Sequence, residues 1–161
     1  MKKVIALLLC VLGIASLAAC GNASNDNPSN VQIPSPFADC DTLDDAAAIS
    51  GFDMSAPDSI DGYDQRIIQA VENEMIQVSY QNGDESITIR KAAGTDDCSG
   101  DYNRYDETKE VAVGAITVTM KGSDGLVNDA TWTNGDHAYA IVAFNSGLSL
   151  EAVTELIQSV D

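Results

Sequence analysis

Ala130-Thr131-Trp132-Thr133-Asn134-Gly135 gives the clearest structural signal in this sequence of 161 residues. Ala130 and Trp132 alternate with two threonines, which is the period of two that a half-buried strand requires. Asn-Gly is the dipeptide that best accepts the positive φ angles of a tight hairpin turn. A mostly apolar run from Ala138 to Phe144 follows. The stretch therefore predicts two antiparallel strands joined by a short turn.

Further back along the chain, alternating apolar and polar residues predict four more strands. They cover Arg66 to Val71, Ile76 to Tyr80, Ile87 to Lys91 and Ile116 to Lys121, with turns at 72–73, 82–84 and 122–125. Because short connections join antiparallel neighbours, we expect one antiparallel sheet of about six strands.

Two helices are predicted outside these strands. Thr42 and Asp45 have the spacing of a capping box, and Gly51 suits a left-handed helix end. Ser149 caps a second helix. The apolar stripe of that helix consists of Val153, Leu156, Ile157 and Val160. The sequence therefore predicts an α+β fold in which an N-terminal and a C-terminal helix cover the sheet.

The N-terminus has the order of a secretory leader, because Met1-Lys2-Lys3 is cationic and Val4 to Leu17 is almost wholly apolar. Leu17-Ala18-Ala19-Cys20 resembles the bacterial lipoprotein signal, in which the cysteine thiol accepts a diacylglyceryl group and the leader is cut before it. The resemblance implies a chain held on the outer face of the cell membrane by acyl chains such as palmitate on Cys20. The alternative is an ordinary signal peptide cut nearby, with Cys20 incidental.

The sequence thus divides into three regions. Residues 1–19 are the predicted signal peptide. Residues 20–36 are the lipidated Cys20 and a tether rich in Asn, Ser and Pro, which is too polar to fold by itself. Residues 37–161 are long enough for a single extracytoplasmic domain with its own core.

The charge balance limits the partners of the chain. The sequence has 8 Lys and Arg against 25 Asp and Glu, a net charge of −17. Loss of Lys2 and Lys3 with the leader leaves 6 basic residues against 25 acidic ones, a net charge of −19. Nucleic acid and anionic lipid headgroups are therefore poor partners. We expect a soluble monomeric domain that meets an envelope protein or a small ligand.

Cys40 and Cys98 form an even pair outside the predicted leader and tether. In an exported protein such a pair predicts a disulfide. Two free thiols are the alternative. A metal site is a poor interpretation of the pair because His137 is the sole histidine.

The segment from Gly94 to Glu107 is the richest in charged and hydroxylated residues. Asp96, Asp97 and Asp101 could contribute oxygen ligands to calcium, but their spacing does not match an EF-hand loop. A solvated loop whose acids pair with nearby basic residues is the favoured interpretation, and we expect no metal or other cofactor.

No motif for a nucleophilic serine, a metalloprotease or a phosphate-binding loop occurs, and His137 is the only candidate imidazole base. We therefore expect no enzymatic activity. A hydrolase that uses two carboxylates stays open as an alternative, because spatial proximity is not visible in a sequence.

Aromatic residues are few, and four of them are candidate ligand-binding groups. Trp132 alternates with threonines and so points to one face of the sheet. Packing in the core is the favoured interpretation, and a binding platform is the alternative. The candidates for that platform are Trp132, Tyr139, Tyr80 and Tyr102.

Several stretches resemble a family of Gram-positive cell-surface lipoproteins that carries a domain of unknown function (domain of unknown function 4367). They are Ile89-Arg90-Lys91-Ala92, Ser99 to Tyr105, Ala130-Thr131-Trp132-Thr133, Tyr139 and Gly147-Leu148-Ser149. The resemblance implies an envelope protein with a sensing or interaction role. It transfers no functional residue, and Cys40 and Cys98 are not part of its pattern.

Three functions follow as expectations. The first is a lipid-anchored, non-catalytic binding or sensing domain outside the cytoplasm. The second is a carrier or receptor for a small apolar ligand, held in a pocket between sheet and helices. The third is a hydrolase that uses carboxylates.

Overall fold

The computed structural model describes residues 35–161, so the predicted leader, Cys20 and nearly all of the predicted tether lie outside the described residues. Within 35–161 the chain forms an α+β fold built on one antiparallel sheet. No helix in this described part is long and apolar enough to cross a membrane.

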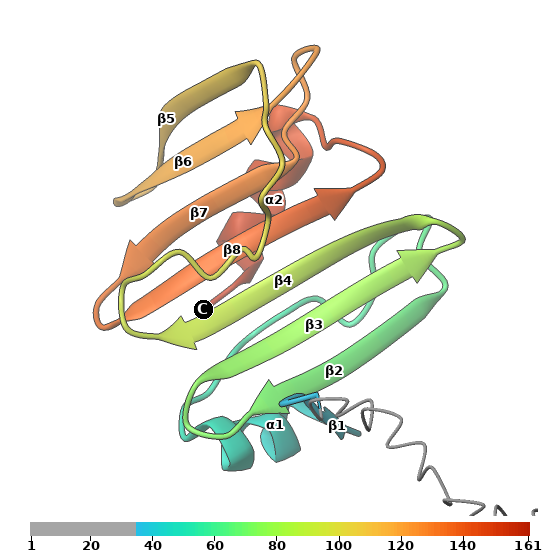
Figure 1. The fold of residues 1–161 in the computed structure, drawn as a ribbon, viewed down its shortest axis with the longest axis vertical. Helices are drawn as coiled ribbons and strands as arrows, with labels where there is room; N and C mark the ends of the chain where they lie inside the picture. Colours follow the sequence, from blue (N-terminus) through green and yellow to red (C-terminus); the bar gives the residue numbers. More distant parts are fainter. Residues whose placement is uncertain (1–34) are drawn as a thin grey trace, which may run out of the picture. The chain divides into compact units, whose positions relative to one another are not determined.

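The sheet has eight strands in the order β1-β2-β3-β4-β8-β7-β6-β5 (Figure 1). The strands are β1 (Ala38–Cys40), β2 (Gln65–Val71), β3 (Met75–Asn82), β4 (Glu85–Ala93), β5 (Glu107–Val113), β6 (Ile116–Gly122), β7 (Asp129–Asn134) and β8 (His137–Phe144). The helices are α1 (Leu43–Ser50), between β1 and β2, and α2 (Leu150–Ser159), after β8.

The sheet consists of two four-stranded halves joined at the β4–β8 pair. In the β4–β8 pair, Ile89 lies opposite Ile141. After β4, in the middle of the sheet, the chain must reach β5 at the far edge. Residues 94–106, which we call the strap, make this crossing over β8, β7 and β6 (Figure 1). The strap thereby brings a polar segment onto one face of the sheet.

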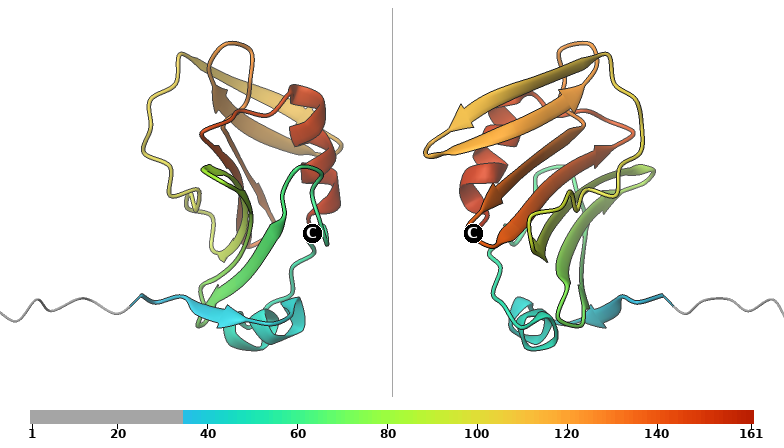
Figure 2. Two further views of the ribbon diagram at one scale, coloured as in Figure 1. Left: turned by 90° about the vertical axis from the view of Figure 1, so that its right-hand side faces the viewer. Right: turned by 60° about the vertical axis from the view of Figure 1, so that its left-hand side comes forward.

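The two faces of the sheet differ because successive strand residues point to opposite sides. On the helical face, Val78, Ile89 and Ile141 lie in register and are almost fully buried in a core that also contains residues of both helices. On the open face, the same three strands present Gln77, Arg90 and Ala140. Figure 2 shows α2 on one side of the sheet and the strap on the other.

The predicted capping of α1 is confirmed. The Thr42 hydroxyl accepts a hydrogen bond from the Asp45 N–H at 3.1 Å, and the Asp45 carboxylate accepts one from the Thr42 N–H at 3.1 Å. Gly51 ends the helix with a φ of 85°, a left-handed conformation that glycine adopts without strain. The second helix is also confirmed, with Ser149 as its N-cap.

The predicted placement of the helices needs correction. The short strand β1 precedes α1, so the first helix is not the first element. α1 packs mainly against β1, β2 and β3, and α2 covers the other half of the sheet. The irregular segment between α1 and β2 supplies the rest of the cover, because Met54 is buried and Phe52, Ile60 and Tyr63 pack against the core. This segment has no regular structure, so its sequence has no hydrophobic periodicity from which its packing on the sheet could be predicted.

The predicted number of strands was too low by two, and both missing strands are edges of the sheet. β1 has three residues, and β5 begins with four exposed residues, Glu107 to Glu110. An edge strand with charged residues shows little apolar alternation, which is also how natural sheets discourage edge-to-edge association. The alternation of apolar and polar residues therefore does not indicate β1 and β5.

The predicted Cys40–Cys98 disulfide is wrong, because both cysteines are free thiols. Cys40 packs against the core of the helical face. Cys98, in the strap, packs with Ala92, Ala138 and Ala140 on the open face. The sheet lies between the two sulfur atoms, and a bond would require one of the segments to leave its place.

We predict two alkylated cysteines when the protein is denatured without reductant and treated with iodoacetamide. In the native protein we expect Cys98 to react more slowly than Cys40, because Cys98 is 8% exposed and burial raises the pKa of its thiol to about 11. Peptide mass spectrometry measures both results. Recovery of a linked Cys40–Cys98 peptide would contradict the structure.

Candidate functional site: a threonine groove on the open face

Four threonines stand on the open face of two neighbouring strands. Thr117 and Thr119 belong to β6, and Thr131 and Thr133 belong to β7. Thr119 is directly opposite Thr131 in the register. Each pair is two residues apart on its strand, so its two side chains point to the same side. The same alternation sends Val118 and Trp132 to the core, which fixes the position of the threonines.

These threonines form the floor of a groove of about 230 Å³. The strap provides one wall through Thr95, Asp96 and Asp97, and Ala138 of β8 extends the floor. The hydrogen bonds between side chains on the open face join other residues, such as Ser79 with Thr88 at 3.1 Å and Arg90 with Gln77 at 2.7 Å. Among residues 35–161, the four threonine hydroxyls of the groove take part in none of these side-chain hydrogen bonds.

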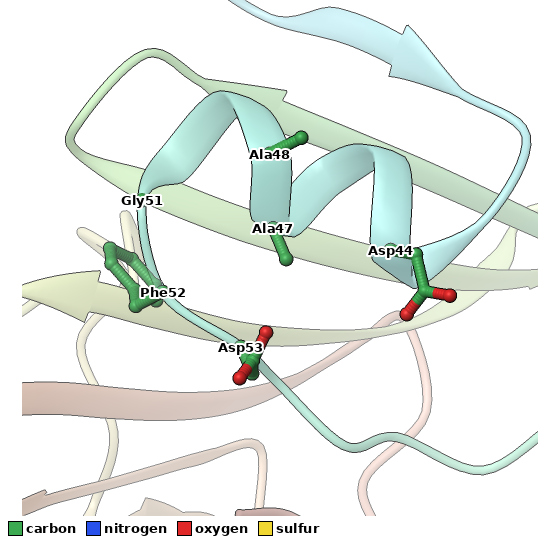
Figure 3. Close-up of a pocket in the computed structure, with 6 residues that line it drawn as sticks. All are labelled: Asp44, Ala47, Ala48, Gly51, Phe52 and Asp53. Carbon is green, nitrogen blue, oxygen red and sulfur yellow. The ribbon is translucent and has the colours of Figure 1, made fainter.

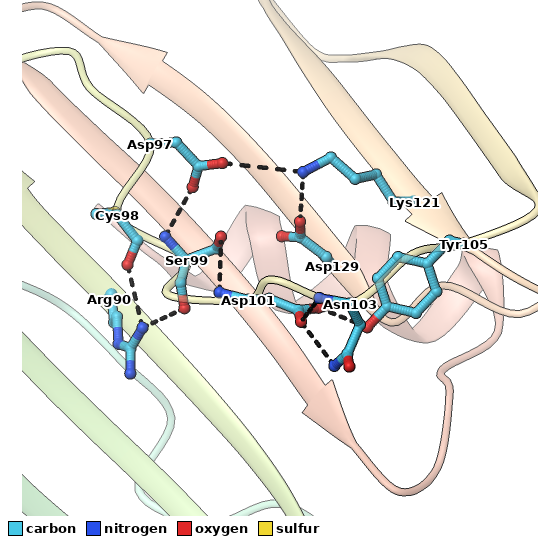
Figure 4. A network of polar contacts seen from close by, with 9 residues as sticks. All are labelled: Arg90, Asp97, Cys98, Ser99, Asp101, Asn103, Tyr105, Lys121 and Asp129. Carbon is cyan, nitrogen blue, oxygen red and sulfur yellow. Dashed lines mark hydrogen bonds and ion pairs between the residues drawn. The ribbon is translucent and has the colours of Figure 1, made fainter.

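The strap is fastened to the sheet by Arg90 (Figure 4). Its guanidinium Nη1 donates to the carbonyl of Cys98 at 3.2 Å and to the carbonyl of Ser99. Gly100 lies against the same guanidinium, and a Cβ at this position would come within 2.5 Å of Nη1. Close approach of backbone and charge explains why glycine occurs here. The fastening holds the wall of the groove in place.

A second fastening joins the strap to β6 and β7. The Lys121 ammonium lies 2.8 Å from Asp129 Oδ2 and 3.8 Å from Asp97 Oδ2 (Figure 4). Asp97 also accepts a hydrogen bond from the Ser99 N–H at 2.8 Å. Burial opposes ionisation of Asp97, but the hydrogen bonds from Ser99 and the nearby Lys121 ammonium lower its pKa overall. Asp97 is therefore an anion at neutral pH.

Asp129 is the most unusual charged residue of the described chain. Its side chain is 1% exposed, and its Oδ1 has no hydrogen-bond partner among residues 35–161. Burial raises the pKa of Asp129, and the hydrogen bond from Lys121 opposes the rise. The same hydrogen bond raises the pKa of Lys121. The Lys121 ammonium therefore offsets the free-energy cost of burying the Asp129 carboxylate.

Asp101 organises the far end of the strap. Its Oδ1 accepts hydrogen bonds from the Asn103 N–H at 2.9 Å and the Asn103 Nδ2 at 2.7 Å. Its Oδ2 accepts the Tyr105 hydroxyl, and burial together with this hydrogen bond raises the pKa of Tyr105 to about 12. These contacts stabilise a local turn, and they leave Tyr105 protonated.

The weak calcium candidates are not brought together. Asp96 lines the groove, Asp97 pairs with Lys121, and Asp101 is used within its own turn. Among residues 35–161 no group of three or more metal-ligating side chains has a geometry able to hold an ion. The Lys121 ammonium occupies the space between Asp97 and Asp129.

Three of the four aromatic candidates belong to the core. Trp132 is 6% exposed and Tyr139 3%, and their rings stack at 5.2 Å between centroids. Tyr80 is 1% exposed and donates its hydroxyl to the carbonyl of Pro57. Tyr102, in the strap, is 95% exposed and points away from the core. Trp132 and Tyr139 also border the threonine groove, whereas Tyr80 and Tyr102 do not, so the four rings do not form a shared platform.

A second depression lies beside α1 (Figure 3). It is larger than the threonine groove, at about 540 Å³, but more open to solvent, and Asp44, Ala47, Ala48, Gly51, Phe52 and Asp53 line it. Two carboxylates on its rim and small side chains on its floor offer no convergent polar groups. We assign it no role, since ligand sites combine concavity with placed polar groups.

Comparison of this chain with protein-family models, with curated proteins and with solved structures finds no match. The resemblance to the lipoprotein family gains no support from these comparisons. The geometry of the open face is therefore the observation from which a function has to be argued.

Sequence reasoning missed the threonine groove. The alternation of threonines with Val118 and Trp132 predicts strands, but it does not by itself show that the threonines of two strands lie side by side. The signal that could have found the groove is the occurrence of Thr-x-Thr in two strands joined through one turn. Such strands are neighbours in an antiparallel sheet, so their like-facing threonines must meet.

Proposed function

We propose that this protein is a lipid-anchored, non-catalytic binding domain that works outside the cytoplasm. We place its ligand-binding surface at the threonine groove on the open face. The observation that supports this proposal most directly is the groove itself, in which threonine hydroxyls without a hydrogen-bond partner among residues 35–161 lie on the sheet beside a fastened wall. Such preorganisation favours binding, because the side chains and the strap lose little conformational entropy when a ligand binds.

A non-catalytic role fits the distribution of acids. Asp129 is the only buried acid among residues 35–161, and it faces an ammonium in place of a second carboxylate. Glycoside hydrolysis requires two carboxyl groups on either side of the scissile bond. His137, the one possible imidazole base, lies edge-on to the Phe52 ring at 4.8 Å, outside the groove.

The anchor is supported by the sequence alone, through the apolar leader and the small residues before Cys20. Two or more acyl chains bind a membrane firmly, whereas one chain does so only marginally. The acidic chain carries few basic residues to attract anionic headgroups, so attachment would depend on the acyl chains.

The carrier hypothesis has less support. It requires space between the sheet and the helices, lined by Trp132 and its neighbours. Trp132, Tyr139 and Tyr80 instead fill that layer as part of one continuous core with the two helices. No observation on the helical face favours an apolar ligand there.

We predict that the full chain, exported from a Gram-positive host fed an alkynyl palmitate analogue, is labelled and remains with the membrane. The Cys20→Ala variant is expected to lose the label. It should also leave the membrane fraction, because its acyl chains are absent. Gel fluorescence and fractionation measure the two results, and Cys10→Ala is the matched control. Equal labelling of the wild type and the Cys20→Ala variant would contradict the anchor.

The binding half of the proposal is tested on the same preparation by native mass spectrometry. We expect a bound molecule that leaves on denaturation and is absent from a Thr119→Val/Thr131→Val variant. These changes keep the volume of each side chain and remove its hydroxyl. A ligand retained by that variant would place the binding surface elsewhere.

A further inference from the structure

We infer that the threonine groove takes a small ligand that carries a protonated amine among hydroxyl groups, as an amino sugar does. The inference rests on the proposed function and assigns a ligand class to the same site. It follows from three properties of the groove: the charge of its lining, the spacing of its hydroxyls and its size.

The charge of the lining is negative. Asp96 and Asp97 are the only Asp, Glu, Lys, Arg or His side chains among the described residues that line the groove, and both are acids. Asp96 is exposed, and the Lys121 ammonium near Asp97 is already bound to Asp129 at 2.8 Å. An approaching cation therefore meets the Asp96 carboxylate, which forms no salt bridge with a basic group of the described residues. An anionic ligand would meet repulsion from both acids.

The hydroxyls form a regular array. Threonines two apart on a strand are separated by about 6.6 Å, and neighbouring strands lie about 4.8 Å apart. Each threonine offers a hydroxyl that donates and accepts, next to a methyl group. A ligand with several hydroxyls on a ring can therefore bond to more than one threonine while its C–H groups contact the methyls. Thr119 and Thr131, which are directly opposite, form the closest pair of this array.

The size of the groove limits the ligand. A volume of about 230 Å³ is below the ~300 Å³ at which pockets for drug-sized ligands begin. The groove therefore suits one sugar-sized unit, or one unit of a longer chain that continues into solvent. The groove is not enclosed, since the sheet is its floor and the strap supplies one wall.

Isothermal titration of the full, lipidated chain in detergent, with glucosamine tetramer as the probe, tests this inference. The N-acetylated tetramer is the matched control, because acetylation removes the positive charge and keeps the ring hydroxyls. We expect the amine form to bind at least about tenfold more tightly, a difference of about 1.4 kcal/mol. Its affinity should fall as salt is raised, because exposed charges are screened.

Variants assign the binding to the groove. Asp96→Asn is expected to abolish the preference for the amine form, and Thr131→Val should weaken both tetramers. Asp84→Asn, in the exposed turn between β3 and β4, is the control for loss of one negative charge elsewhere. The melting temperature of each variant is measured in parallel to show that the fold is retained.

Equal affinity for the two tetramers, or binding that Asp96→Asn leaves unchanged, would overturn the inference. Absence of binding to either tetramer would overturn it as well. Native mass spectrometry tests the proposed function separately. If it detects a different molecule bound at the threonines, the protein is still a binding domain, but its ligand belongs to another class.

Discussion

Replacing Lys121 by methionine is expected to lower the free energy of unfolding by about 3 kcal/mol at pH 7, the lower end of the range for breaking a buried ion pair. The variant keeps the alkyl stem of the side chain but leaves Asp129, which is 1% exposed, without its 2.8 Å partner. The lower end applies because the Lys121 side chain is 30% exposed and water already reaches it.

The effect should depend on pH in a defined direction. Burial raises the pKa of Asp129, and loss of Lys121 removes the hydrogen bond that opposes the rise. A carboxyl whose pKa is higher in the folded state favours folding where it is protonated, and this contribution is lost as pH rises through the folded pKa. The Lys121→Met variant should therefore approach the wild type in stability as pH falls from neutral toward about 4, near the ordinary carboxyl value.

Urea unfolding followed by circular dichroism at several pH values measures this prediction. Asp129→Asn added to Lys121→Met removes the buried charge and should restore most of the lost stability at pH 7. Lys109→Met is the control for loss of an exposed lysine on β5, and its effect should stay within about 0.5 kcal/mol. A deficit of Lys121→Met that stays constant with pH would show that the charge of Asp129 is not its cause.

Replacing Trp132 by alanine is expected to lower the free energy of unfolding by about 3–5 kcal/mol, the cost of removing a large buried aromatic side chain. Trp132 is 6% exposed and stacks on Tyr139 with an angle of 8° between the rings. Its removal leaves a space beside the helical face that the rigid sheet cannot close. A tryptophan on an open binding platform would instead change stability little when replaced.

Circular dichroism is the probe for this variant, because Trp132 is the single tryptophan and its fluorescence is lost with it. Thr133→Ala, one position further along β7 and exposed, is the matched control and should change stability by no more than about 0.5 kcal/mol. Comparable stability of the Trp132→Ala variant and the wild type would contradict the placement of this ring in the core.

Much of the fold was predictable from residue patterns. The capping box at Thr42, the left-handed Gly51 and the Asn134-Gly135 turn each depend on neighbours in sequence, so local chemistry determines them. The two edge strands were not predicted because both faces of an edge strand are exposed, so apolar and polar residues do not alternate clearly along it. The pairing of β4 with β8 joins segments about 50 residues apart, and no local signal specifies it.

The candidate site was less predictable. The carboxylates of the strap were identified from composition, but their partners come from β6 and β7 through the crossing of the sheet. The prediction of a disulfide was wrong for the same reason, since spacing along the chain does not show that the sheet separates Cys40 from Cys98. Each threonine alone is an ordinary strand residue, and the groove arises from the register that places Thr119 opposite Thr131.

The joining of β4 to the last strand also sets an order for folding. Synthesis runs from the N-terminus, so the hairpins β2–β3–β4 can form while β8 has not yet emerged. Until His137–Phe144 is available, β4 exposes a row of unpaired amide and carbonyl groups along Glu85–Ala93. The chain is therefore most vulnerable to wrong strand pairing before β8 has emerged. Because its central contacts are distant in sequence, closure of the sheet is a slow step that follows the faster local hairpins.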